Sequence, residues 1–155
     1  MKGNRTAYRR ALKLLFIFYS VVMLWLLFGQ RIGFQSGRSY FDTVAQRINL
    51  IPLSTVAHQI SLIIQGSARA RHCIINLGGN VILFIPLGLL MPCIWRSLRN
   101  FGRFVLAVAI MISAVEIIQL FSLLGSMDID DLMLNLCGAS IGFALLKIAN
   151  KVKNK

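Results

Sequence analysis

Four long apolar runs constrain what this chain can fold into more than any other feature. They cover residues 12–29, 74–95, 104–124 and 132–149. About 20 mostly apolar residues are enough for an α-helix to cross the hydrocarbon core of a bilayer. Since backbone groups in lipid must be hydrogen-bonded within the chain, such runs form helices. The sequence therefore predicts an all-α fold, a polytopic membrane helical bundle with four transmembrane helices, as a single domain over residues 1–155.

The composition also indicates a membrane protein. Apolar residues make up 57% of the chain and charged residues 14%, whereas soluble domains average about 45–50% and about 25%. The net charge of +12 comes without any nucleic-acid-binding motif, so we expect no nucleic-acid partner. No P-loop, Rossmann or nucleophile-elbow motif is present. We therefore predict no cofactor, and we favour a non-enzymatic protein over an enzyme.

The basic residues predict an orientation. Twelve of the 17 Lys and Arg residues lie in the N-terminal segment, between the second and third runs, and at the C-terminus. Four spans place these three segments on one side of the membrane, and the positive-inside rule makes that side cytoplasmic. We therefore expect both termini in the cytoplasm, with the connection 31–73 and the short turn before residue 132 outside.

The outer connection contains a predicted amphipathic helix. From Leu53 onward, apolar residues recur at helical spacing up to Ile64, and Pro52 precedes them, where proline is tolerated. A helix of this kind lies in the membrane interface with its apolar face toward lipid. The series Phe41, Val44, Ile48 repeats the pattern more weakly.

A polar layer is predicted in the outer half of the bilayer. At a rise of about 1.5 Å per residue, all strongly polar residues inside the last three runs fall on that side, apart from the cationic end of the last run at Lys147. They are Asn76, Asn80, Glu116, Gln119 and Asn135. A membrane-embedded Glu is costly unless it is paired, hydrated or protonated. We therefore expect Glu116 to face the bundle interior, with Asn80 as its neighbour.

Three of the five acidic residues, Asp128, Asp130 and Asp131, stand immediately before the last run. One interpretation is structural: Asp128 and Asp131 cap the last helix, and the buried amides hold helices together. The other is an outward-opening polar pocket, with Glu116 carrying a proton and Asp130 and Asp131 facing a cation or a cationic headgroup. Capping explains only one or two of the three aspartates. They are also weak candidates for a cation site, but no metal is predicted.

Four motifs resemble those of the VanZ-like membrane proteins of bacteria. They are "NLIPL" (49–53), "NLGGNVILFIPLG" (76–88), "EIIQL" (116–120) and "DIDDLMLNLCGASIGF" (128–143). The resemblance implies a multi-pass protein of the bacterial plasma membrane. The founding member of that family is associated with lowered susceptibility to teicoplanin, a lipoglycopeptide antibiotic. Family members usually carry an Arg shortly before the DIDD-like segment, where this chain has Gly125 and Ser126. If that Arg balances the carboxylates, Arg69 or Arg71 would have to replace it here.

Three hypotheses for the function follow. The first is a cell-envelope protein that binds or reorganises a lipid-linked or amphiphilic molecule at the outer leaflet. The second is an intramembrane enzyme or proton-coupled lipid translocator that uses Glu116 with Asp130 or Asp131. The third is a structural assembly partner, with oligomerisation through Gly138 and Gly142, which are spaced as G-x-x-x-G. The expected partners are membrane lipids, a lipid-linked envelope precursor or a lipoglycopeptide. The ligand-binding candidates are Asn76, Asn80, Glu116, Gln119, Asp128, Asp130, Asp131 and Asn135.

Overall fold

Four long helices dominate the computed structural model, which describes residues 2–29 and 39–153. They are α1 (Lys2–Phe28), α4 (Ala70–Ile94), α5 (Phe101–Phe121) and α6 (Ile129–Lys153). All four are long and apolar enough to cross a membrane, so the predicted all-α membrane bundle is confirmed. Helices α4 and α6 begin a few residues before their apolar runs, because a helix can extend past the hydrocarbon core into polar surroundings.

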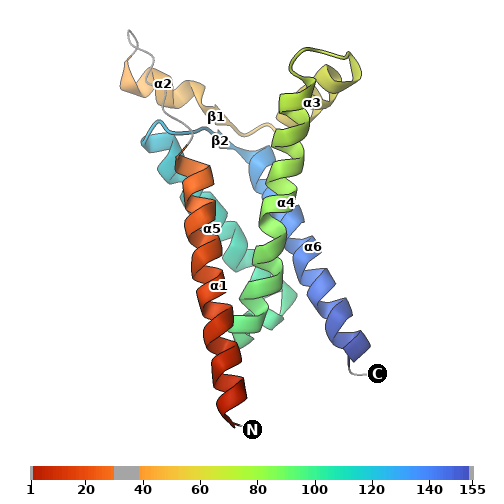
Figure 1. The fold of residues 1–155 in the computed structure, drawn as a ribbon. Coiled ribbons are helices and arrows are strands. Elements are labelled where there is room, and N and C mark those ends of the chain that lie inside the picture. Colours follow the sequence, from red (N-terminus) through yellow and green to blue (C-terminus); the bar gives the residue numbers. More distant parts are fainter. Residues whose placement is uncertain (1, 30–38, 154–155) are drawn as a thin grey trace.

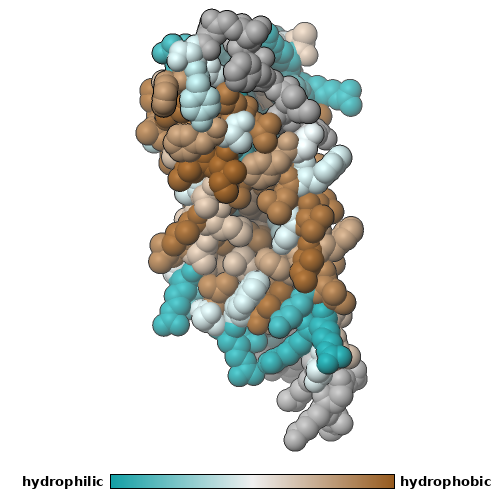
Figure 2. All heavy atoms as spheres, turned by 90° about the vertical axis from the view of Figure 1, so that its left-hand side faces the viewer, coloured by the Kyte–Doolittle hydropathy of each residue, from teal (hydrophilic) through white to brown (hydrophobic). Residues whose placement is uncertain are grey.

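The two ends of the bundle differ in structure (Figure 1). Both described termini lie at one end, and η1 (Arg96–Arg99) connects α4 to α5. The opposite end carries α2 (Tyr40–Gln46), α3 (Ser54–Ile64) and two short strands. On the face that Figure 2 shows, apolar side chains cover the middle, and hydrophilic side chains lie toward both ends. Residues 30–38 of the predicted outer connection and the basic residue Lys155 lie outside the described part.

Helices α4 and α6 pack in close contact because glycines line the seam between them. A β-carbon on Gly88 would overlap the backbone of Ala139 and Phe143 in α6. A β-carbon on Gly138 or Gly142 would overlap backbone carbonyl groups of α4. The G-x-x-x-G pair therefore serves a contact within the chain. An oligomer would need another surface, because this one is already buried.

The remaining helices pack around this central pair. Phe104 and Val108 of α5 are completely buried, and the Phe104 ring lies 5.0 Å from that of Phe143, centroid to centroid. Helix α1 is peripheral: Met23 is buried, and the Tyr19 hydroxyl donates to the carbonyl of Leu83 at 2.7 Å. Most other α1 side chains are exposed, as expected for a lipid-facing helix.

Two connections pair at the end opposite the termini. Strand β1 (Ile48–Asn49) runs parallel to β2 (Met127–Asp128), with Asn49 opposite Asp128. No periodicity in the sequence predicted this two-residue pairing. It fixes the segment before α3 beside the start of α6, and so brings the motifs "NLIPL" and "DIDD" together.

The amphipathic helix predicted from Leu53 is present as α3, and the weaker pattern around Phe41 forms α2. Helix α3 packs against α4 but buries none of its residues completely. Ile60 and Ile64 are 44% and 79% exposed. An apolar face left uncovered at the end of a membrane bundle is suited to the lipid interface.

Candidate functional site

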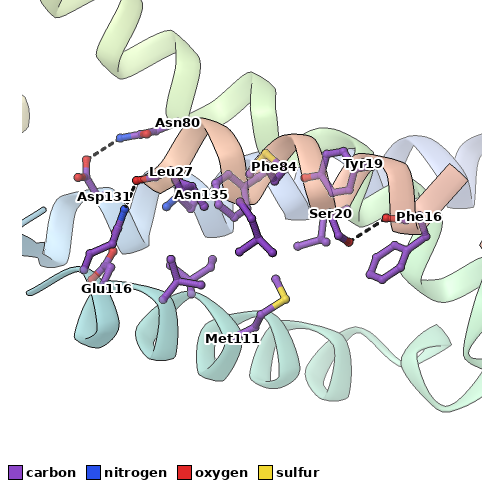
Figure 3. A pocket seen from close by; sticks show the side chains of 16 residues that line it. Phe16, Tyr19, Ser20, Leu27, Asn80, Phe84, Met111, Glu116, Asp131 and Asn135 are labelled. Atoms are coloured by element: carbon purple, nitrogen blue, oxygen red, sulfur yellow. Dashed lines mark hydrogen bonds between the residues drawn. The ribbon is translucent and has the colours of Figure 1, made fainter. Parts of the chain in front are cut away.

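A cavity of about 220 Å³ lies between the four long helices. Its polar lining comes from Asn80 of α4, Glu116 and Gln119 of α5, and Asp131 and Asn135 of α6. Its apolar lining comes mainly from α1 and α5, including Phe16, Met23, Leu24, Leu27, Met111 and Ile112. Figure 3 shows Asn80, Glu116, Asp131 and Asn135 toward one end, whereas Phe16, Tyr19, Ser20 and Met111 lie farther along the cavity. The hydroxyl groups of Tyr19 and Ser20 are already bonded to backbone carbonyls. The cavity therefore has one polar end and one long apolar part.

Asn80 pairs with Asp131 across the α4–α6 seam. Its Nδ2 donates to Asp131 Oδ1 at 2.5 Å (Figure 3). We predicted Asn80 as the neighbour of Glu116; both side chains line this cavity, and the hydrogen bond of Asn80 is made to Asp131. The reason is the glycine seam: because α4 lies so close to α6, Asn80 reaches the first turn of α6.

Glu116 lines the cavity with a carboxylate oxygen that accepts no hydrogen bond from the described residues. The side chain is 6% exposed, and Oε1 has no hydrogen-bond partner among the described residues. The same holds for Oδ1 of the neighbouring Asn135. Buried polar atoms are almost always hydrogen-bonded, so such orphans indicate where a ligand, water or proton would bind. Glu116 faces the bundle interior, as predicted.

Gln119 joins α5 to α1 at the polar end. Its Nε2 donates to the carbonyl oxygen of Leu27 at 2.7 Å (Figure 3). This contact fits the interhelical role that the structural interpretation gave to the buried amides. Asn76 has a similar role outside the cavity, because its Oδ1 accepts from Gln59 Nε2 of α3 at 3.1 Å. No pattern singled out Gln59 as a contact of Asn76, because it resembles any polar residue of an amphipathic helix.

Asp128 caps α6 and also holds the chain before α3. Its Oδ1 accepts the backbone N–H of Asp130 at 2.9 Å, the geometry of an N-cap. Its Oδ2 accepts the Thr55 hydroxyl at 2.6 Å. Asn49 Nδ2 donates to Thr55 Oγ1 at 2.8 Å and approaches Asp128 Oδ1 at 3.3 Å. The predicted cap at Asp128 is present.

Asp130 caps a different helix, α3. It is 1% exposed, and its Oδ2 accepts the backbone N–H groups of Thr55 and Val56 at 2.9 and 3.0 Å. Its Oδ1 accepts the N–H of Leu53 at 2.5 Å, a residue with a left-handed φ of 65°. The expectation that Asp130 faces a cation is therefore wrong. A carboxylate fits here because the first N–H groups of a helix lack intrahelical partners.

The described ranges 2–29 and 39–153 contain no group of three or more His, Cys, Asp or Glu side chains placed to hold a metal ion. The three aspartates separate for a geometric reason. Asp128 and Asp130 point toward the chain around α3, whereas Asp131 lines the cavity. Consecutive helical residues point in different directions, so a compact cluster in sequence becomes two sites in space.

Comparison with known proteins agrees with the motifs. A family model described as VanZ/LLP1 matches residues 16–150.

The chain belongs to the VanZ/LLP1 family.

Protein VanZ of Enterococcus faecium is 27% identical over 138 residues, which cover 88% of this chain and 74% of that protein. No solved structure significantly matches. The family membership and the four apolar helices make this VanZ/LLP1 chain a multi-pass membrane protein.

Arg47 lies at the connection that precedes "DIDD". Arg69 and Arg71, which we expected to replace the missing arginine, are exposed at the start of α4. Instead, Arg47 Nη1 donates to the carbonyl of Leu123 and approaches that of Gly125 at 3.4 Å. The guanidinium therefore lies at the connection that leads into "DIDD". Its position follows from strand pairing, since Met127 N–H donates to the Arg47 carbonyl at 2.9 Å.

The apolar part of the cavity was not predicted. Met23, Leu24 and Leu27 of α1 and Met111 of α5 line it. Every span contains such residues, and the sequence does not distinguish those that line a cavity from those that face lipid. Only the helix rotations make that distinction.

Proposed function

We propose that this VanZ/LLP1 protein binds an amphiphilic or lipid-linked molecule of the cell envelope in the cavity between α1, α4, α5 and α6. Binding is non-covalent, and it lowers susceptibility to lipoglycopeptides such as teicoplanin, the association known for the founding member of the family. The observation that carries the proposal is the two-part cavity. Unpartnered oxygens of Glu116 and Asn135 lie at one end, and an apolar lining extends from there.

The cavity volume limits what it can hold. Sites for drug-sized ligands have about 300–1,000 Å³, and this cavity has about 220 Å³. It therefore encloses part of an amphiphile, such as a polar linkage and the first portion of its hydrocarbon chain. The rest of the ligand would extend into the lipid.

The basic residues give the cavity its orientation in the proposal. Arg96, Arg99 and Arg103 lie at the end with the termini, whereas Glu116 and Asp131 lie toward the other end. By the positive-inside rule, the termini are cytoplasmic and the polar end of the cavity is in the outer leaflet of the bacterial plasma membrane. An outer-leaflet envelope precursor or a lipoglycopeptide would approach from that side.

A proton-coupled translocator is the second candidate, and Glu116 favours it. A buried carboxyl group with an unpartnered oxygen is suited to exchange a proton during transport. In the translocator, Asp131 would be the carboxylate that acts together with Glu116, because it lines the same cavity. Asp130 is not, because both its oxygens accept backbone N–H groups at α3.

The test uses Glu116→Gln and Asp131→Asn, with Asp42→Asn as a matched control. Asp42 is an exposed carboxylate of α2, away from the cavity lining. We expect the two cavity variants to lose protection against teicoplanin at unchanged protein levels. The amount of amphiphile that co-purifies with them should also fall about tenfold, because each variant loses about one hydrogen bond to a charged group. Asp42→Asn should resemble the wild type.

If both cavity variants keep full protection and full retention, the binding proposal is wrong. The translocator is distinguished by transport in reconstituted vesicles. Glu116→Gln would abolish proton-coupled lipid movement while the amphiphile still binds.

A further inference from the structure

The end of the bundle with the termini carries basic side chains and no acidic ones. The five acidic residues of the chain are Asp42, Glu116, Asp128, Asp130 and Asp131. Four of them belong to α2, β2 and the first turn of α6, at the opposite end. Glu116 is separated from the first residue of α5 by about 22 Å at a rise of about 1.5 Å per residue. Within the described residues, no acidic side chain therefore lies near the cations at this end.

One hollow at this end is built around Arg99 and Lys147. It has about 480 Å³ and is also lined by Tyr8, Cys93 and Asn150. Arg99 Nε donates to the carbonyl of Pro92 at 3.3 Å, and Lys147 Nζ lies 5.5 Å from the ring centroid of Phe143. Both cations are thus held in place by contacts with the bundle, while Tyr8 and Asn150 add hydrogen-bonding groups.

A second hollow also borders the end of α4. It has about 380 Å³, and Arg9, Arg10 and Lys13 of α1 line it together with Ile94 and Cys93. Cys93 lines both hollows, so they are adjacent at the last turn of α4. We call the two hollows together the basic recess; its lining also includes the apolar side chains of Leu12, Ile94 and Leu146.

We infer that this recess binds the phosphate group of an anionic phospholipid, with Arg99 and Lys147 as the principal contacts. Phosphate is the anion that arginine and lysine side chains recognise best. A lipid is indicated rather than a soluble anion, because the recess lies at the ends of transmembrane helices. Pro92 and Leu146 of the first hollow offer apolar surface to the glycerol and acyl groups. Basic pockets between transmembrane helices bind anionic headgroups in this way.

The inference concerns the opposite end of the bundle from the amphiphile cavity, so it does not depend on the proposed function. The first measurement needs no variant. The purified protein is placed in nanodiscs of phosphatidylcholine with a minor fraction of phosphatidylglycerol, and the lipids that remain bound are counted by native mass spectrometry. We expect phosphatidylglycerol to be retained over phosphatidylcholine by about tenfold. Equal retention of the two lipids would overturn the inference.

The second measurement locates the site. The double variant Arg99→Gln with Lys147→Gln is compared with Arg96→Gln with Lys151→Gln. All four positions are exposed, but the control pair lines neither hollow. The first pair should lose about tenfold in preference for phosphatidylglycerol, and the control pair less than about twofold. If both pairs lost the preference for phosphatidylglycerol equally, the preference would come from diffuse surface charge. That result would contradict a specific site at Arg99 and Lys147.

A third measurement separates a lipid from a free anion. Inorganic phosphate at millimolar concentration is added to the wild-type nanodiscs, and it should leave bound phosphatidylglycerol unchanged. Displacement of the lipid would overturn the choice of a phospholipid. The charge-preserving variant Arg99→Lys should keep most of the preference, which shows that a loss in the glutamine variants is not a failure to fold.

Discussion

The carboxylate of Asp130 in α6 accepts the backbone N–H of Val56 in α3 at 3.0 Å, across 74 positions of the sequence. A side chain from the start of one helix thus caps the start of another. This contact, the β1–β2 pair and the Asp128–Thr55 hydrogen bond form one connected unit. The unit fixes the first turn of α6, and Asp131 is in that turn. Asp128 and Asp130 therefore stabilise the fold at this end of the bundle and orient Asp131 toward the cavity.

Replacing Asp130 should loosen α3. Asp130→Ala leaves three N–H groups without an acceptor, and the free energy of unfolding should fall by about 3 kcal/mol. Asp130→Asn keeps one acceptor oxygen, so its free energy of unfolding should fall by about half as much as that of Asp130→Ala. Thermal unfolding in detergent measures the change, and hydrogen exchange at residues 53–56 localises it. Asp42→Asn is the control, and an equal effect there would contradict the capping role.

The glycine seam gives a second prediction. Gly138→Ala places a methyl group against the backbone of Val81, and overpacking of this kind costs about 1–3 kcal/mol. Gly79→Ala on α4 meets open space and should be neutral or stabilising by up to about 1 kcal/mol. Thermal unfolding of the two variants under identical conditions provides the comparison. If both alanines were tolerated equally, the close α4–α6 contact would be refuted.

Filling the apolar part of the cavity should block the amphiphile without touching a polar group. Met111→Trp adds bulk at a position that lines the cavity. Ile110→Trp adds the same side chain at the adjacent residue, which is 62% exposed and outside the lining. Retention of co-purified lipid should fall in the first variant only. A loss in both variants would point to a general disturbance of α5.

Gln119 should hold the outer part of α1 against α5. Gln119→Leu removes the donor to Leu27, an interhelical hydrogen bond worth about 0.6 kcal/mol on average in membrane proteins. Spin labels at the exposed positions 25 and 121 should then show a broader distance distribution. Ser122→Ala is the control, because the Ser122 hydroxyl bonds only within its own turn, to the Gln119 carbonyl. An unchanged distribution in Gln119→Leu would mean that packing alone holds α1.

The proposed orientation can be tested with single cysteines in a cysteine-free background. Gln65→Cys at the end of α3 and Ser97→Cys in η1 are both exposed, at opposite ends of the bundle. An impermeant maleimide added to intact cells should label residue 65 and spare residue 97. Disruption of the cells should make residue 97 reactive as well. The reverse pattern would place the termini outside and move the cavity's polar end to the inner leaflet.

Much of the architecture could be predicted because it depends on local properties. Run length and hydropathy predicted the four spans, helical periodicity predicted α3, and the cost of a membrane-embedded acid predicted that Glu116 faces inward. The two-residue pairing of Asn49 with Asp128 could not be predicted, since strands that short carry no periodic signal. The hydrogen bond from Asn80 to Asp131 could not be predicted either, because depth alone does not fix helix rotation.

Hydropathy and charge along the chain are enough to predict how many helices this VanZ/LLP1 chain can place in a membrane, where they lie, and which end is basic. These properties depend on the transfer free energy and the charge of each segment taken alone. The roles of the three aspartates instead depend on how the helices pack. The glycine seam and the β1–β2 pair set the rotation of α6, so Asp128 and Asp130 cap helices and Asp131 faces Asn80 in the cavity. A contact between residues far apart in sequence depends on that rotation, and no single segment encodes it.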